Sequence, residues 1–144
     1  MANQAYIKLV PSSVKQTITI DELKETLEYY KEITGKTGEQ LNWQYNEAAF
    51  PYEITEEIVN NTKQLILISN HERYHSITLS INEEKASNSD ENEAIQTYIQ
   101  LTLTNRSTYG DKGKANEFCK FLANKFQGEL HLFNGRIMYY YKRK

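Results

Sequence analysis

Two stretches of the chain repeat apolar residues at the spacing of an amphipathic α-helix. The first stretch places its apolar residues at Ile20, Leu23, Leu27 and Tyr30. Thr19 and Glu22 match the Ser/Thr-x-x-Glu capping box, so we predict that this helix starts behind Thr19 and ends near Gly35.

The second helical stripe is wider, and it consists of Ala115, Phe118, Cys119, Leu122, Ala123 and Phe126. Asp111 is the expected N-cap, and Gly128 is expected to end the helix. Because Cys119 lies inside the apolar stripe, we interpret it as a buried structural thiol and not as a nucleophile.

Other stretches have the period of two that is typical of β-strands. We expect strands at 5–10, 65–69, 74–81 and 95–104. The third and fourth turn alternate residues to one face, namely His75, Ile77, Leu79 and Ile81, and Ile95, Thr97, Ile99, Leu101 and Leu103. The polar stretch 82–94 between them is predicted to be a connecting loop.

The pattern over residues 36–63 is weaker. Leu41, Trp43 and Tyr45 alternate with polar residues and suggest a strand, and Pro51 marks a bend at Phe50. The run from Thr55 to Glu57 is expected to cap one or two helical turns that reach Asn61.

The chain closes with a predicted hairpin, because Asn134-Gly135 is the preferred sequence of a two-residue type I′ turn. This turn pairs Phe133 with Arg136, Leu132 with Ile137, His131 with Met138 and Leu130 with Tyr139. One face would then carry Leu130, Leu132, Ile137, Tyr139 and Tyr141, and the other Glu129, His131, Phe133, Arg136, Met138 and Tyr140.

Together these elements predict an α+β fold. We expect a single domain over residues 1–144, with one antiparallel sheet of about five to six strands, two main helices packed on one face and a C-terminal β-hairpin.

Composition narrows the function classes. A formal net charge of −2 with 25% charged residues gives no bulk attraction to nucleic acid or to an anionic membrane. One cysteine excludes an internal disulfide and fits a reducing compartment. No signal peptide pattern is recognised, and the run Leu65–Ile68 is far too short to span a bilayer, so a cytoplasmic location is expected.

The sequence from His71 to His75 matches the zinc-protease pattern H-E-x-x-H, with Glu72 as the acid. That chemistry needs a helix, since only there do both imidazoles reach one zinc ion. The motif lies between two predicted strands and is better explained as a polar turn. We therefore expect no metal and no cofactor, with His71 and His75 as outside candidates.

The sequence Thr108–Lys114 opens the second helix with glycines and lysines, and a helix N-terminus of this kind can hold an anion. It lacks a Walker A pattern, because Thr108 and Ala115 stand where that loop needs a glycine and a Ser or Thr. A helix capped by Asp111 is the favoured interpretation.

The candidate binding surface is one face of the C-terminal hairpin: His131, Phe133, Arg136, Met138 and Tyr140. Aromatic residues, Met and Arg favour the centres of protein interfaces, so a protein partner or a second copy of the chain could bind there. The same residues with the basic tail 142–144 could stack nucleic-acid bases, which the acidic net charge disfavours. A covered face would make them part of the core.

Three stretches, at 5–11, 41–47 and 132–137, resemble a small family of uncharacterised proteins from spore-forming, low-GC Gram-positive bacteria. The resemblance covers nearly the whole chain. It implies a compact cytosolic bacterial protein, and it carries no activity to any residue.

We therefore expect a non-catalytic binding or interaction module. The alternatives are a metal-dependent hydrolase that uses His71, Glu72 and His75, and a weak nucleic-acid binder that uses the hairpin.

Overall fold

The structure is a computed structural model that describes residues 3–40, 52–70, 73–85 and 95–141. Within these residues, seven strands form one sheet: β1 (Gln4–Lys8), β2 (Glu53–Val59), β3 (Thr62–Ile68), β4 (Ser76–Lys85), β5 (Ile95–Thr102), β6 (Glu129–His131) and β7 (Ile137–Tyr139). Their order is β2-β3-β4-β5-β1-β6-β7, and every neighbouring pair is antiparallel. The α+β class and the single antiparallel sheet are thus confirmed, with one strand more than predicted.

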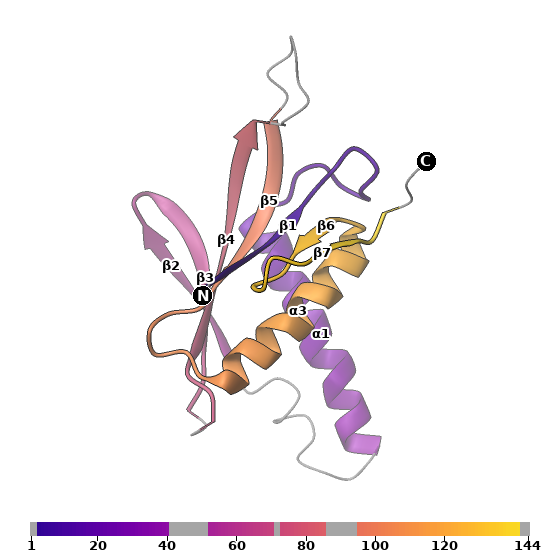
Figure 1. Ribbon diagram of the computed structural model, residues 1–144. Helices are drawn as coiled ribbons and strands as arrows, with labels where there is room; N and C mark the ends of the chain where they lie inside the picture. The colour runs from indigo at the N-terminus through magenta and orange to yellow at the C-terminus, as the bar shows by residue number, and fades with distance from the viewer. Residues whose placement is uncertain (1–2, 41–51, 71–72, 86–94, 142–144) are drawn as a thin grey trace.

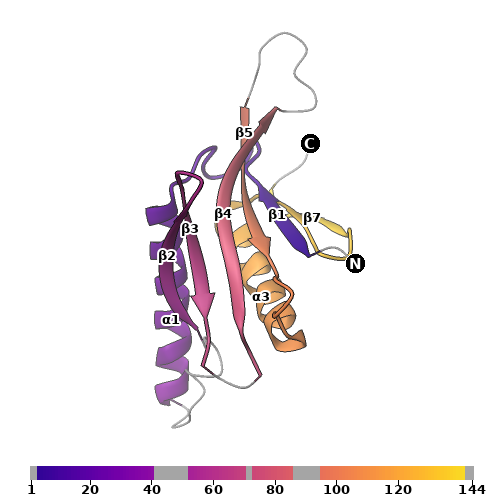
Figure 2. The ribbon, with the colours of Figure 1, turned by 90° about the vertical axis from the view of Figure 1, so that its left-hand side faces the viewer.

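The two helices of the described residues, α1 (Ile20–Gln40) and α3 (Tyr109–Phe126), pack on the same face of the twisted sheet (Figures 1 and 2). That face carries fully buried residues paired across the strands, including Leu65, Leu67, Ile77, Leu79, Ile99 and Leu101. The helices meet each other where the Tyr30 ring contacts Phe118 and Phe121 edge-on, at 5.5 and 4.8 Å between centroids. The opposite face of the sheet has no helix against it in the described part of the chain.

Helix α1 begins as its capping box predicts. The Glu22 N–H donates to Thr19 Oγ1 at 3.1 Å, and the Thr19 N–H donates to Glu22 Oε1 at 3.2 Å. The predicted end at Gly35 is wrong, because the helix continues to Gln40. A glycine ends a helix only where the chain turns left-handed; inside a helix it merely costs about 1 kcal/mol relative to alanine.

Helix α3 carries the predicted stripe, and all of its members are buried. The N-cap is Thr108, which corrects the prediction of Asp111. Asp111 is the third helical residue, and its carboxylate accepts the Thr108 N–H at 2.9 Å in a capping box. At the C-terminus Gln127 takes the left-handed conformation and Gly128 follows.

Strand β2 replaces the helical turns that were predicted from Thr55 to Asn61. Its β-branched residues Ile54, Thr55, Ile58 and Val59 favour an extended backbone. Asn60 and Asn61 have φ of 53° and 64°, and they join Val59 to Thr62 in a two-residue turn of the type I′ kind. Asparagine tolerates this left-handed conformation. The turn brings β3 beside β2, so the backbone of β2 pairs with β3 in an antiparallel ladder.

The β6–β7 register differs from the prediction by one residue. Leu130 pairs with Met138 and His131 with Ile137, whereas the type I′ turn had paired them with Tyr139 and Met138. The Gly135 N–H donates to the Leu132 carbonyl at 3.0 Å, and Gly135 has φ +86°. This is a three-residue loop with glycine at its left-handed position, a geometry that Asn-Gly serves equally well.

Strand β4 continues to Lys85, which pairs with Ile95 at the start of β5, so residues 82–85 are strand and not loop. Figure 1 shows this hairpin extending beyond the other strands. The predicted strand at Leu41–Tyr45 and the bend at Phe50-Pro51 lie outside the described residues, as do 86–94.

Candidate functional site

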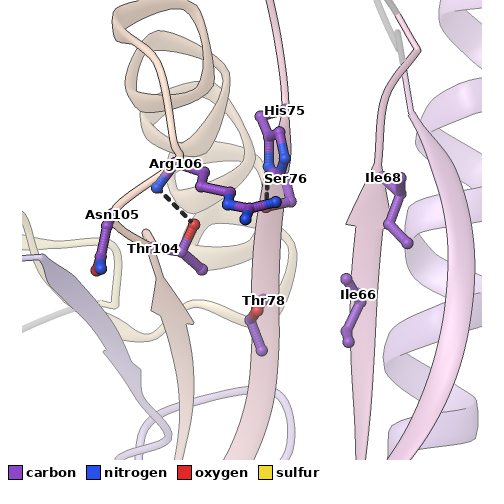
Figure 3. A pocket seen from close by; sticks show the side chains of 8 residues that line it. All are labelled: Ile66, Ile68, His75, Ser76, Thr78, Thr104, Asn105 and Arg106. Atoms are coloured by element: carbon purple, nitrogen blue, oxygen red, sulfur yellow. Dashed lines mark hydrogen bonds between the residues drawn. The ribbon is translucent and has the colours of Figure 1, made fainter.

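The bare face of the sheet contains a hollow of about 460 Å³, widely open to solvent (Figure 3). Its lining comes from the ends of β3 and β4 and from the segment after β5: Ile66, Ile68, His75, Ser76, Thr78, Thr104, Asn105 and Arg106. Small-molecule sites in proteins usually have volumes of about 300–1,000 Å³. The hollow is therefore large enough for a small organic ligand.

The apolar floor follows from the alternation of strand β3. Leu65 and Leu67 point into the core and are fully buried, so Ile66 and Ile68 must point to the other face. Ile68 is 44% exposed. The run Leu65–Ile68 is apolar throughout because one set of side chains fills the core and the other set forms this floor.

Arg106 provides the positive charge of the hollow. Its segment is fixed by hydrogen bonds from the Thr104 N–H to Ser107 Oγ at 2.8 Å and from Ser107 Oγ to the Ser76 carbonyl at 2.9 Å. Figure 3 shows the Arg106 side chain extending toward His75 and Ser76. Among the described residues its guanidinium has no carboxylate partner.

A buried carboxylate holds this wall of the hollow in place. Asp111 is fully buried and accepts the backbone N–H groups of His75, Ser76 and Thr108 at 2.9, 3.3 and 2.9 Å. It also accepts the Tyr52 hydroxyl at 2.6 Å. Burial, followed by this hydrogen bond to Asp111, raises the pKa of Tyr52 above its ordinary value.

Close packing adds to this anchor. A Cβ atom on Gly110 would lie 2.6 Å from the Arg73 carbonyl oxygen, and Thr108 Oγ1 donates to the same oxygen at 2.6 Å. The first turn of α3 is therefore in direct contact with the segment that leads into β4.

The polar residues of the hollow do not form a catalytic triad. His75 Nδ1 and Ser76 Oγ lie 2.8 Å apart, but they are chain neighbours, and no carboxylate orients the His75 ring in the described part of the structure. Asp111 contacts only the backbone of these two residues. Nucleophilic catalysis needs a base that a third group orients, and this arrangement lacks that group.

The described part of the zinc-protease pattern, residues 73–75, is not helical. His71 and Glu72 lie outside the described residues. Arg73 lies in a turn, Tyr74 and His75 have no regular secondary structure, and His75 leads directly into β4. No group of three or more potential metal ligands occurs among the residues that the structure describes.

The β6–β7 register differs by one residue from the predicted one, and this places the residues of the predicted binding surface on different faces. Phe133 is buried, and Met138 and Tyr140 pack against the core beside Leu130. His131 lies on the opposite face with its neighbour Ile137, and Nε2 of His131 is 3.2 Å from Glu129 Oε1. The five predicted residues are therefore not on one exposed face.

Arg136 and Phe133 instead line a second hollow, of about 280 Å³, between α3 and the β6–β7 loop. Its other lining residues are Lys112, Asn116, Lys120, Leu132 and Asn134. The sequence analysis missed both lysines, and it also missed Arg106. The available signal was the spacing of 112, 116 and 120, which places them in one row along the edge of the apolar stripe.

Cys119 is buried, as predicted. Its burial raises the pKa of the thiol to about 12, which suppresses the thiolate at neutral pH.

The fold is an α+β fold in which helices cover one face of an antiparallel sheet, and a hollow lined by Ile66, Ile68 and Arg106 opens on the other face. Residues 3–142 match the model of a domain of unknown function, DUF1885, and the chain belongs to this family. A solved structure described as a protein of unknown function from Bacillus stearothermophilus is similar, with 40% identity and a TM-score of 0.54. The match covers 88% of this chain and 91% of that chain.

These findings confirm the resemblance to an uncharacterised family that includes Gram-positive bacteria. A search of curated proteins finds no match. In the described part of the chain, neither helix is long and apolar enough to cross a membrane.

Proposed function

We propose that this protein is a non-catalytic binding module that holds a small organic acid in the hollow on the bare face of the sheet. One observation carries the proposal: the hollow joins an apolar floor at Ile66 and Ile68 to a guanidinium, Arg106, that no carboxylate of the described residues neutralises. A ligand with an apolar body and a carboxylate complements both parts.

The chemistry of arginine favours this ligand class. A guanidinium presents paired N–H donors that match the two oxygens of a carboxylate. His75 and Ser76 add polar groups at the same wall, and Thr78 adds a hydroxyl between the floor and that wall. The anchor on Asp111 holds the wall before a ligand arrives, which lowers the entropic cost of binding.

Calorimetric titration with 3-phenylpropionate tests the proposal, with the uncharged 3-phenylpropionamide as the matched ligand. We expect saturable binding of the acid, and weaker binding of the amide. Arg106→Gln should weaken binding of the acid at least about tenfold, since a hydrogen bond to a charged group contributes about 1.5–3 kcal/mol.

Arg136→Gln is the control, because it removes the same charge from an exposed arginine outside this hollow. Equal affinity of Arg106→Gln and the unchanged protein would contradict the proposal. So would an equal loss in the two variants, which would mean that only net charge matters.

A further inference from the structure

The hollow between α3 and the β6–β7 loop has a composition that differs from the first. Three basic residues lie around it, Lys112, Lys120 and Arg136, together with the amides of Asn116 and Asn134. No acidic side chain is among its lining residues as the structure describes them. In a chain of net charge −2, this is a local concentration of positive charge.

Helix α3 carries two of these cations, and the β6–β7 loop carries the third. Lys112, Asn116 and Lys120 recur every four residues, so they share the face of α3 that borders the hairpin. Figure 1 shows β6 and β7 beside this helix. Phe133 lies in the same loop and is only 3% exposed, so its side chain packs into the core.

The loop also fixes the backbone of Arg136. The Arg136 N–H donates to Asn134 Oδ1 at 2.9 Å, and its carbonyl accepts the Leu132 N–H at 2.8 Å. The side chains of Arg136 and Lys120 are exposed, and neither is paired with a carboxylate of the described residues. Their charge is thus available to a ligand.

We propose that this hollow is a second, independent site, which binds the diphosphate group of a small phosphorylated molecule. Cations on two sides match an anion with several negative charges better than a single carboxylate, and lysine and arginine are the usual phosphate ligands. The volume of about 280 Å³ suits a small anion, and Leu132 and Phe133 offer an apolar floor to its organic part.

Titration with inorganic pyrophosphate at physiological ionic strength is the test, because salt at this level screens weak long-range attraction. We expect saturable binding that is tighter than that of orthophosphate. Lys120→Gln and Arg136→Gln should each weaken it at least about tenfold, the loss that one charged contact produces. Both side chains are exposed, and unchanged thermal unfolding would show that the variants fold.

Two further variants make the result specific. Lys125→Gln removes an exposed charge from the same helix outside the hollow, and Arg106→Gln removes one from the first hollow; both should retain affinity. An equal loss in Lys125→Gln and Lys120→Gln, equal affinity for orthophosphate, or no saturation at millimolar pyrophosphate would each overturn the proposal. None of these outcomes bears on 3-phenylpropionate binding, so the two sites are tested separately.

Discussion

Asp111 shows at the scale of one residue how a buried charge can organise a fold. Its carboxylate accepts three backbone N–H groups and one hydroxyl, and it joins the start of α3 to the start of β4 and to Tyr52. A buried carboxylate is costly unless donors of this kind surround it. Here the donors come from three separate segments of the chain.

Replacement of Asp111 by alanine should lower the free energy of unfolding by about 3 kcal/mol or more, because buried donors lose their acceptor. Tyr52→Phe removes only one of these hydrogen bonds and should cost less, about 1.5–3 kcal/mol, the contribution of one hydrogen bond to a charged group. Urea denaturation of both variants measures the difference. Equal losses would show that Asp111 does not connect the three segments.

The sequence predicted that Asp111 caps helix α3. Asp111 does take part in the cap, but as the third helical residue and not as the N-cap. Thr108 and Asp111 form a capping box with an acid at the third position, a pattern that resembles a simple Asp cap on paper. The contact with Tyr52 is invisible to local reasoning, because 59 positions separate the two residues.

At the scale of elements, the N-terminal end of α3 contains two glycines, Gly110 and Gly113, that can be compared directly. A methyl group on Gly110 would meet the Arg73 carbonyl at 2.6 Å, whereas one on Gly113 would meet nothing within 4 Å. Gly110→Ala should therefore destabilise the protein by about 1–3 kcal/mol, as overpacking does. Gly113→Ala should stabilise it by about 0.5–1 kcal/mol through helix propensity.

Thermal or urea unfolding of the two alanine variants checks this prediction. The change in the free energy of unfolding should have opposite signs for the same substitution at two glycines only three positions apart, because Gly110 is in contact with Arg73 and Gly113 has open space beside it. If both variants gained stability, the first turn of α3 would not lie against the Arg73 segment.

The two hairpin turns explain which parts of the fold the sequence could predict. Asn60-Asn61 forms the tight two-residue turn although its strand was predicted as helix, and Asn134-Gly135 forms a longer loop although its sequence favours the tight turn. Burial decides the second case. The observed register turns Met138 and Tyr140 toward the core, and a shift of one residue reverses every side chain of a strand.

At the scale of the whole molecule, the spacing of apolar residues predicted the helices, the core stripe and the class of fold. Burial of one face of each element imposes this spacing on the sequence. The spacing did not predict the strand order, since β1 pairs with both β5 and β6, far away in the sequence. The hollow on the bare face was missed for the same reason. Ile66, Thr78 and Arg106 come from separate segments, and only the sheet brings them together.

Isoleucine methyl groups report directly on this central feature. Ile66 and Ile68 line the hollow, whereas Ile77 lies in the core on the other face and Ile137 lies in β7. Titration of an isoleucine-methyl-labelled sample with 3-phenylpropionate should shift the Ile66 and Ile68 signals progressively and to saturation, with Ile77 and Ile137 unchanged. Shifts at Ile137 without shifts at Ile66 and Ile68, or no saturable shift at all, would contradict a ligand site on the bare face of the sheet.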